Sequence, residues 1–564
     1  MAQDSRTLER SQPSAVHAAK RAPSPHPLLP PEVQDDYRRR GLWEDRTLAE
    51  IVAGWAADDP ARIAVTGEMP LTYAELWERA RRLGGTLAEG GVGPGEFVLA
   101  VMSNSWQGVV LAVAASVAGV ALSPLSSRAS TTLVVNIAEQ VGARGLVLEA
   151  DLLADETWQT AFASLRAGLR GGPVLLQGSP PRGSEYASLR TLEQSALSGP
   201  LMEQRDPDPG RVSLAISTGG TTGRPKSVLH CENSMIYASR RFAAATDFTQ
   251  SDVLVAFGPY GHASGSVLEV VMPLLCGASI LPNRRWKALP VAEAIARYGG
   301  TFCITVGTHM FDLLALEPES DGMLRSLRLV TSGAGPDQLF VDAERRFGFP
   351  IVRVFGLSEC VGHAVGRPSD PAELRLHRDG VPFEGVDWMV RDAAGAPAPL
   401  GAAGEYLCRS PSLFMGYFGQ PELTQSSVTE DGYYRTGDLM TADADGYITW
   451  SGRIKDVIRR GGLQIDALEM EQMLSEHAAV AEVVVIGEPD ERLGERVVVV
   501  VVPRAGAAPL DLDGACAHLT SRGLGRESLP EKLVIAGSLP RTEFGKFHRV
   551  EIKRRLVDGA AFDG

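Results

Sequence analysis

The chain alternates short apolar runs with helix-like stretches between about residues 32 and 439. Three strand–helix pairs show this pattern best: 97–102 with 106–120, 253–258 with 266–275, and 327–332 with 337–347. Strands that alternate with helices form mainly parallel sheets covered by helices. The pattern therefore predicts an α/β fold with stacked, mainly parallel sheets, and the length of 564 residues predicts at least two domains.

The pattern of predicted helices and strands changes in two places farther along the chain. Between about residues 385 and 452, Asp-Gly turns separate short strands, which predicts a small antiparallel, β-barrel-like section. A second unit of roughly 110 residues follows, with the mixed patterns of a small α+β domain. Its run 497–502 is apolar on both faces and should be a central strand. We expect three parts: a disordered arm at 1–31, a large N-terminal domain at 32–454 and a C-terminal domain at 455–564.

Charge and cysteine content narrow the function classes. The formal net charge of −14 disfavours nucleic acids and anionic membranes as partners, since both favour basic patches. The six cysteines include no CxxC pair, so neither a metal cluster nor a redox dithiol is predicted. The longest apolar stretch, 109–122, is shorter than the roughly 20 residues that span a bilayer and is expected to be a buried helix. Unpaired cysteines and the lack of a visible secretory signal indicate a cytoplasmic location.

The segment from Ser217 to Lys226 reads STGGTTGRPK and follows an apolar predicted strand at 212–216. Its glycines let the backbone wrap closely around a ligand. Its hydroxyl groups and the Lys226 cation suit a polyphosphate. The residue order does not fit a Walker loop, which requires GxxxxGK[ST]. A simple Gly/Thr turn is the plainer alternative, but a lysine after Gly-x-Pro makes the string more specific.

This string resembles the phosphate loop of the adenylate-forming (ANL) superfamily, which includes acyl-CoA synthetases, aryl acid–AMP ligases, peptide-synthetase adenylation domains and luciferases. Further segments resemble the family's motifs in the family's order: LTYAEL at 71–76, FGLSE at 355–359, YRTGD at 434–438, GRIKD at 452–456, RGG at 460–462 and PRTEFGK at 540–546. The likeness covers about residues 31 to 556. The chain is therefore identified as a member of the acyl-CoA synthetase or aryl acid–AMP ligase type.

The resemblance implies the chemistry. In such enzymes a carboxylate oxygen attacks the α-phosphate of ATP and pyrophosphate leaves, so the protein must supply cations and hydrogen-bond donors. Catalytic roles are implied for Lys546, Thr221, Lys226, Glu359 and His262. Glu359 and Thr221 would hold Mg²⁺, a hard cation that favours oxygen ligands. The residues implied to bind ATP are Ser217, Thr218, Gly219, Gly220, Thr222, Gly223, Gly333, Ala334, Gly335, Phe355, Gly356, Ser358, Asp438 and Arg453.

Several of these implied roles have ordinary structural alternatives. Asp438 would accept hydrogen bonds from both ribose hydroxyls, but a Gly-Asp turn is the simpler explanation of that residue. Phe355 would stack on adenine opposite the wall formed by 333–335, but both could be plain core packing. Glu359 could cap a helix, and Lys546 could be a surface lysine.

The C-terminal domain of the family is a mobile unit that rotates between adenylation and thioester formation. Lys455 matches the pivot position, which must absorb large backbone changes. After rotation, Gly461 and Gly462 would line a thiol tunnel for the pantetheine arm of the acceptor. The chain departs from the family pattern at Gly219, Ser227, Phe355 and 463–464. These substitutions are expected to affect how strongly the protein binds the nucleotide.

The acyl pocket should be formed largely by the segment 259–265. Its implied lining residues are Tyr260, His262, Ala263, Gly265, Gly333 and Val361. Ala263 falls where amino-acid-activating members carry Asp and where catechol-acid ligases carry Asn, so α-amino acids and salicylate-type acids are both disfavoured. Glu269 lies close by in the sequence and could bind an amine of the substrate, although a solvated or helix-capping role is more ordinary.

We therefore predict activation of a hydrophobic carboxylic acid (aliphatic, alicyclic or aromatic) to acyl-AMP, followed by transfer to CoA. The main alternative is a stand-alone acid–AMP ligase that loads the phosphopantetheine of a carrier protein in trans during natural-product biosynthesis. A luciferase-type oxygenase would share nearly every motif, and a non-catalytic nucleotide-binding relative is the most remote option. A homodimer is compatible with each of these functions.

Overall fold

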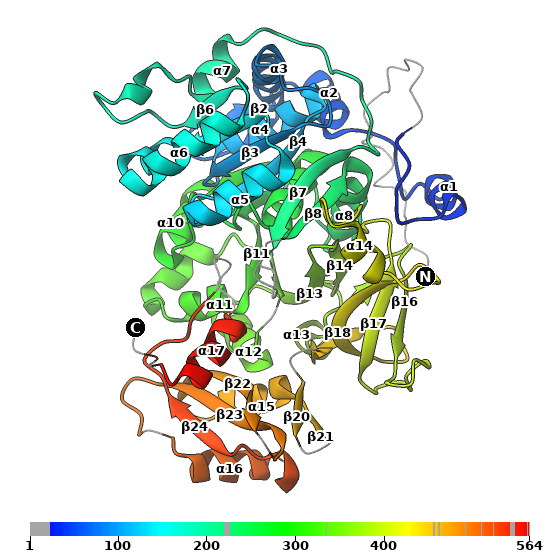
Figure 1. The fold of residues 1–564 in the computed structure, drawn as a ribbon, viewed down its shortest axis with the longest axis vertical. Coiled ribbons are helices and arrows are strands. Elements are labelled where there is room, and N and C mark those ends of the chain that lie inside the picture. The colour runs from blue at the N-terminus through cyan, green and yellow to red at the C-terminus, as the bar shows by residue number, and fades with distance from the viewer. Residues whose placement is uncertain are drawn as a thin grey trace.

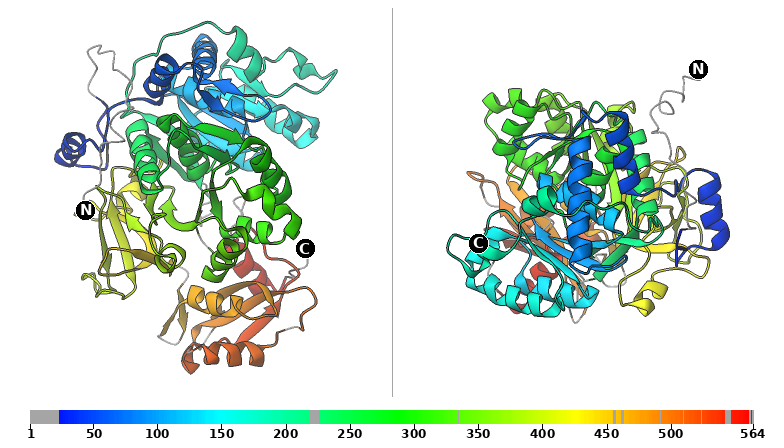
Figure 2. Two further views of the ribbon diagram at one scale, coloured as in Figure 1. Left: turned by 180° about the vertical axis from the view of Figure 1, so that it is seen from behind. Right: turned by 90° about the horizontal axis from the view of Figure 1, so that it is seen from above.

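The computed structural model describes residues 23–218, 226–333, 335–454, 457–460, 463–490, 492–508, 510–522, 524–541, 547–560 and 562. Figure 1 shows two large sheets with their helices, a smaller antiparallel sheet beside them, and a separate C-terminal unit at one end of the molecule. Figure 2 shows the C-terminal unit at the same end from behind. The predicted α/β architecture, with a large N-terminal part and a small α+β C-terminal part, is confirmed.

The first large sheet has six strands in the order β6-β5-β3-β4-β7-β8. Its strands are β3 (Phe97–Met102), β4 (Ala121–Ser126), β5 (Gly145–Glu149), β6 (Val174–Gln177), β7 (Val212–Thr218) and β8 (Lys226–Cys231). The helices around it are α3 (Tyr73–Glu89), α4 (Trp106–Ala118), α5 (Thr131–Val141), α6 (Glu156–Gly168) and α7 (Leu192–Ser198). All neighbouring pairs are parallel except the β7–β8 hairpin, which ends the sheet.

The second large sheet has nine strands in the order β15-β14-β13-β12-β11-β9-β10-β1-β2. Its strands are β1 (Ile63–Val65), β2 (Leu71–Thr72), β9 (Val253–Ala256), β10 (Ser279–Pro282), β11 (Phe302–Val306), β12 (Leu329–Gly333), β13 (Ile351–Leu357), β14 (Cys360–Val365) and β15 (Val381–Pro382). Its helices are α2 (Leu48–Asp58), α8 (Glu232–Ala245), α9 (Met272–Cys276), α10 (Ala288–Tyr298), α11 (Gly307–Leu314), α12 (Asp337–Phe347) and α13 (Ala372–His377). The parallel core from β10 to β13 aligns the carboxyl ends of its strands along one edge.

Two predicted helices differ in detail from the structure. The apolar stretch 109–122 is not one helix, because Gly119 adopts a left-handed conformation with φ of 69° and ends α4 before β4 begins. The predicted helix at 266–275 is helical, but its first part, Ser264–Val271, is a π-helix that continues into α9. A π-helix is rare and often marks a functional region.

The antiparallel section predicted at 385–452 is a four-stranded sheet in the order β16-β17-β18-β19. Its strands are β16 (Asp387–Arg391), β17 (Gly404–Arg409), β18 (Tyr434–Ala442) and β19 (Ile448–Arg453), and α14 (Pro421–Ser426) lies in the connection between β17 and β18. The aromatic side chains of Phe414, Tyr417 and Tyr434 pack together where this section meets the large domain. This packing places β18 next to the phosphate hairpin.

The C-terminal unit has its own five-stranded sheet and its own core. Its elements are β20 (Ile458–Arg460), β21 (Leu463–Ile465), β22 (Val480–Asp490), β23 (Gly494–Pro503), β24 (Lys532–Ile535), α15 (Ala467–Ser475), α16 (Leu512–Ser521) and α17 (Arg549–Asp558). The strand β23 pairs with β22, β20 and β24, as expected for a central strand. Val497, Val499 and Val501 face α15 and α16, whereas Val498 and Val500 face α17.

Of the arm predicted to be disordered at 1–31, the structure describes residues 23–31, and these are ordered, whereas residues 1–22 lie outside the described residues. Residues 23–30 pack against the large domain before α1 (Pro31–Arg39) begins. The Ser24 hydroxyl donates to Asp208, and the ring of His26 makes a buried hydrogen bond with the carbonyl oxygen of Leu413 at 3.0 Å. These contacts order the segment despite its polar, proline-rich sequence. Among the described residues, no helix combines the length and apolar character needed to cross a membrane.

Candidate active site

The phosphate loop sits at the tip of the β7–β8 hairpin. Thr218 pairs with Lys226 and Ser217 pairs with Ser227, so the two strands hold both ends of the loop. The hydroxyl oxygen of Ser217 is buried and makes no hydrogen bond within the described structure, as expected of a group that is completed by a ligand. The predicted ligands between these ends, Gly219, Gly220, Thr221, Thr222 and Gly223, lie outside the described residues.

Glu359 lies close to the phosphate hairpin, in the tight turn between β13 and β14. The phenol of Tyr417 donates a hydrogen bond of 2.7 Å to Oε1 of Glu359. The ammonium of Lys226 lies 5.0 Å from the centroid of the same Tyr417 ring. The predicted phosphate lysine and the predicted metal carboxylate therefore both contact Tyr417, the lysine over the ring face and the carboxylate at the hydroxyl, and Glu359 caps no helix.

Ser358, the neighbour of Glu359, is held from the other side by His230. Burial lowers the pKa of His230 to about 4, so its imidazole is neutral near pH 7. Its Nε2–H donates to the carbonyl oxygen of Ser358 at 2.7 Å. His230 belongs to β8, so the strand that begins at Lys226 also fixes the turn that carries Glu359.

The predicted ribose site joins two neighbouring strands. Asp438 on β18 lies opposite Arg453 on β19, and its Oδ1 is 2.7 Å from Nε of Arg453. The indole N–H of Trp450 donates to the same oxygen at 2.9 Å. The Asp438 side chain is 1% exposed, so this carboxylate is held firmly in one place. Trp450 was not predicted from the sequence, because nothing in the motif pattern distinguishes it from a core tryptophan.

The predicted adenine wall is only partly tested by the structure. Phe355 is buried on β13, and its ring packs edge-on against His363 at 5.9 Å and Tyr406 at 6.0 Å. Core packing is thus part of its role, and adenine stacking stays a prediction. Gly333 ends β12, Gly335 follows it in a bend, and Gly356 is exposed at the end of β13. Ala334 lies outside the described residues.

The predicted acyl-pocket residues surround the start of the π-helix. Tyr260, Ala263 and Gly265 are buried there, and Val361 is buried on β14. The Tyr260 hydroxyl donates to the carbonyl oxygen of Gly108. A Cβ atom at position 265 would lie 2.2 Å from the carbonyl oxygen of Pro259, so only glycine fits this bend. Nδ1 of His262 is hydrogen-bonded to the hydroxyl of Ser264 at 2.7 Å, which fixes the ring orientation.

Glu269 has a different role from those considered for it in the sequence. It is neither solvated nor a helix cap, because it is 1% exposed and its carboxyl accepts the backbone N–H of Gly258 at 2.8 Å. The side chain of Asn104 donates to the carbonyl oxygen of the same Gly258 at 2.8 Å. Glu269 and Asn104 therefore clamp the backbone at the entrance to the acyl-pocket segment.

Replacing Glu269 by glutamine is expected to change how stability depends on pH. Burial raises the pKa of Glu269 from 4.5 to about 8. Between these values the folded state holds a proton that the unfolded state lacks, so the free energy of unfolding falls as pH rises from about 4.5 to about 8. Each pKa unit corresponds to about 1.4 kcal/mol, so the free energy of unfolding of the wild type should decline by a few kcal/mol over this pH range. The Glu269→Gln variant should lack this decline. Chemical denaturation at pH 5 and pH 8 measures this, and equal pH slopes in both proteins would contradict it.

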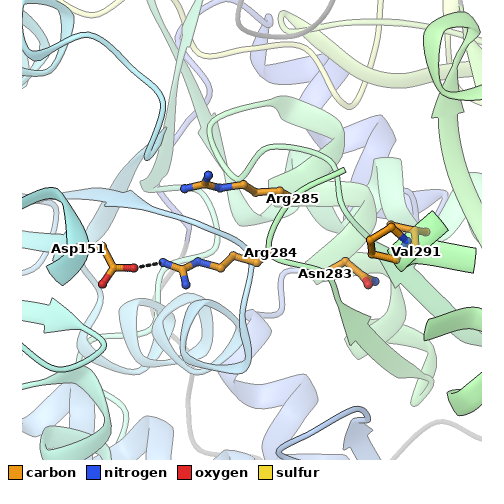
Figure 3. A pocket seen from close by; sticks show the side chains of 6 residues that line it. Asp151, Asn283, Arg284, Arg285 and Val291 are labelled. Atoms are coloured by element: carbon orange, nitrogen blue, oxygen red, sulfur yellow. Dashed lines mark hydrogen bonds and ion pairs between the residues drawn. The ribbon is translucent and has the colours of Figure 1, made fainter. Parts of the chain in front are cut away.

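A hollow of about 460 Å³ opens at the carboxyl edge of β9 and β10. It is lined by Asp151, Asn283, Arg284, Arg285, Pro290 and Val291, and Figure 3 shows both arginines extending from the segment after β10. Asn283 is tied to the strand before the acyl segment, because its N–H donates to the carbonyl oxygen of Ala256 at 2.7 Å. The charge of Arg284 is neutralised by Glu149 and by Asp151 at 2.7 Å. The hollow contains none of the predicted site residues.

The predicted pivot, thiol tunnel and catalytic lysine fall in three short segments in the C-terminal part of the chain. Lys455, Gly461, Gly462 and Lys546 all lie outside the described residues. The segment that contains Lys546 is bracketed by Arg541 and Phe547, which form a β-bridge with each other. The two ends of this segment therefore lie side by side, and Arg541 also donates to Glu482 of β22 at 2.6 Å.

The comparisons with known proteins cover almost the whole chain. The family of AMP-binding enzymes matches residues 52–418, and the AMP-binding enzyme C-terminal domain matches residues 469–546. The medium-chain fatty-acid–CoA ligase of Escherichia coli (strain K12) is 30% identical over 542 residues, which cover 92% of this chain and 93% of that protein. The salicyl-AMP ligase / salicyl-S-ArCP synthetase of Mycobacterium tuberculosis is 31% identical over 549 residues, with 94% of each protein covered.

A similar solved structure is that of ATP-bound MatB from Rhodopseudomonas palustris. It has a TM-score of 0.80 and a sequence identity of 26%, and the match covers 90% of this chain and 99% of that one. The first family match includes the phosphate hairpin, Glu359 and Tyr417, and the second includes Lys546.

Proposed function

The chain belongs to the family of AMP-binding enzymes, and we propose that it uses ATP to convert a hydrophobic carboxylic acid to acyl-AMP and then passes the acyl group to CoA. The observation that carries the site assignment is the Lys226–Tyr417–Glu359 cluster, in which the cation lies over the face of the tyrosine ring and the carboxylate accepts the phenol O–H. Tyr434 links this cluster to the ribose site. It lies on β18, the strand that also carries Asp438, and its hydroxyl oxygen is 3.4 Å from the hydroxyl oxygen of Tyr417.

The residues of the site fit the needs of adenylation. The carboxylate of the acid attacks the α-phosphorus of ATP, the bond to the β,γ-diphosphate breaks, and pyrophosphate leaves. Lys226 and the buried hydroxyl of Ser217 would bind the departing phosphates. Glu359 and Thr221 would hold Mg²⁺, which supplies positive charge against the phosphate oxygens. Asp438 would fix the ribose, and Lys546 would neutralise charge at the reacting carboxylate and α-phosphate.

CoA is the acceptor that we propose, and a carrier protein in trans is the second candidate. The names of the relatives include both acceptor types, a CoA ligase from Escherichia coli and a salicyl-S-ArCP synthetase from Mycobacterium tuberculosis. Supplying purified enzyme, ATP and acid with either CoA or a phosphopantetheinylated carrier protein, and detecting the thioester by mass, distinguishes the two. A cytoplasmic site of action, where both ATP and CoA are available, is part of the proposal.

The acid preference is tested by ATP–pyrophosphate exchange with a panel of acids. Ala263 is buried in the pocket segment and offers no polar group to a substrate. Octanoate or benzoate should therefore support exchange at least about tenfold better than salicylate or an α-amino acid. The Ala263→Asn variant should narrow the gap for salicylate, because it adds a side-chain amide. Exchange with none of the acids would overturn the proposed function, and a preference for salicylate would overturn the pocket assignment alone.

A further inference from the structure

We propose that Tyr417 is a positioning residue that keeps Lys226 and Glu359 from pairing with each other, so that the lysine stays available to the phosphates of ATP and the carboxylate to the metal. The inference rests on the roles assigned to Lys226 and Glu359 in the proposed function. It assigns to Tyr417 a role that the sequence motifs did not indicate, since Tyr417 belongs to none of them.

The side chain of Tyr417 engages both charged groups at once. Its ring faces the Lys226 ammonium, 5.0 Å from the centroid, and its hydroxyl donates to Oε1 of Glu359 at 2.7 Å. In the part of the chain that the structure describes, neither Lys226 nor Glu359 forms an ion pair. A cation on the ring face and an anion at the phenol hydrogen are both favourable, so the tyrosine satisfies each charge separately.

The position of the ring is fixed by the backbone. The segment 413–418 runs antiparallel to β8, with Tyr417 opposite Val228 and with the N–H of Phe418 donating to the carbonyl oxygen of Ser227 at 2.9 Å. The same segment holds the turn of Glu359, because the N–H of Phe414 donates to the carbonyl oxygen of Glu359 at 2.8 Å. The ring centroids of Phe414 and Tyr417 are 4.8 Å apart, so the tyrosine cannot easily swing away.

Removing the Tyr417 side chain would favour a direct ion pair between Lys226 and Glu359. Opposite charges in a partly buried site attract more strongly than in water, because the local dielectric constant is lower. Without the ring that engages the ammonium and the hydroxyl that engages the carboxylate, the flexible lysine could reach the carboxylate and form an ion pair. ATP would then have to break that pair before it could bind, and the metal would lose a free ligand. The expected consequence is weaker binding of ATP, with or without metal.

The test is a double-mutant cycle measured by calorimetric titration of ATP in EDTA and in Mg²⁺. Tyr417→Leu should weaken ATP binding in EDTA about tenfold, whereas Tyr417→Phe, which keeps the ring over the ammonium and loses only the hydrogen bond to Glu359, should weaken it less, about threefold. Adding Glu359→Gln to Tyr417→Leu should restore most of the lost affinity in EDTA, because the competing anion is gone. A purely structural role of Tyr417 would give no such rescue.

Further variants distinguish the positioning role of Tyr417 from the phosphate contact of Lys226 on which it depends. Phe162→Leu on α6 disturbs a buried aromatic pair with Tyr186 that lies outside the site, and it should lower the melting temperature without changing ATP affinity. Lys226→Ala tests the assumed phosphate contact by itself, and unchanged ATP affinity in that variant would overturn the premise. Weaker binding in Lys226→Ala together with unchanged binding in Tyr417→Leu, or no rescue by Glu359→Gln, would overturn the role of Tyr417 alone.

Discussion

Replacing Lys546 by alanine is expected to reduce acid-dependent ATP–pyrophosphate exchange by about 10²- to 10³-fold. In the proposed reaction, Lys546 supplies the positive charge that offsets the negative charge built up between the carboxylate and the α-phosphate. Removing one such preorganised group typically costs about 3–4 kcal/mol of transition-state stabilisation. Thioester formation from preformed acyl-AMP and CoA should continue at nearly the wild-type rate, because the proposed domain rotation withdraws Lys546 before that step.

The matched control for Lys546 is another lysine of the C-terminal unit. Lys553 on α17 pairs with Glu495 at 2.8 Å, and its side chain is 42% exposed. An exposed ion pair of this kind contributes little, so Lys553→Ala should leave both half-reactions unchanged. Equal loss of both half-reactions in Lys546→Ala would show that the variant had damaged the domain as a whole. Full exchange activity would remove Lys546 from the adenylation step.

The elements of the fold were predictable where a local pattern decides them. The helix expected at 337–347 is α12 (Asp337–Phe347), because an apolar stripe, an acidic start and a terminal glycine all lie within one segment. The split of 109–122 into a helix and a strand depends on the left-handed conformation of Gly119, which an apolar stretch rich in Ala and Gly does not reveal. The π-helix at Ser264–Val271 was likewise not predictable, because the sequence was searched for the 3.6-residue period of an α-helix.

The candidate site was predictable through its motifs but not through the residues that support them. Tyr417 and Glu359 are 58 residues apart in the chain, and their hydrogen bond exists only because the two segments meet in the fold. Trp450 reaches Asp438 across two paired strands. Glu269 accepts from the N–H of Gly258, and Asn104 donates to the carbonyl oxygen of the same residue. Such contacts depend on tertiary geometry, so a sequence pattern cannot separate these side chains from ordinary core residues.

Replacing Asp438 by asparagine is expected to raise the KM for ATP about a hundredfold with a smaller effect on kcat. A carboxylate can accept hydrogen bonds from both ribose hydroxyls, whereas an amide replaces one acceptor oxygen by a donor. Hydrogen bonds to a charged group contribute about 1.5–3 kcal/mol each, so the loss of one or two corresponds to about 3 kcal/mol. Arg453 and Trp450 already hold this side chain in place, so the nucleotide does not bear the cost of ordering it.

Asp379 provides the control that separates ribose binding from stability. It is buried like Asp438, and it also binds an arginine and Trp450: Oδ1 accepts from Arg353 at 2.9 Å and Oδ2 accepts from the backbone N–H of Trp450 at 2.7 Å. Both Asp438→Asn and the control variant Asp379→Asn weaken a buried charge pair, so both should lower the melting temperature. Only Asp438→Asn should also raise the KM for ATP. If both variants raised it equally, the effect of Asp438 would come from the position of β19, and ribose binding would have to be assigned elsewhere.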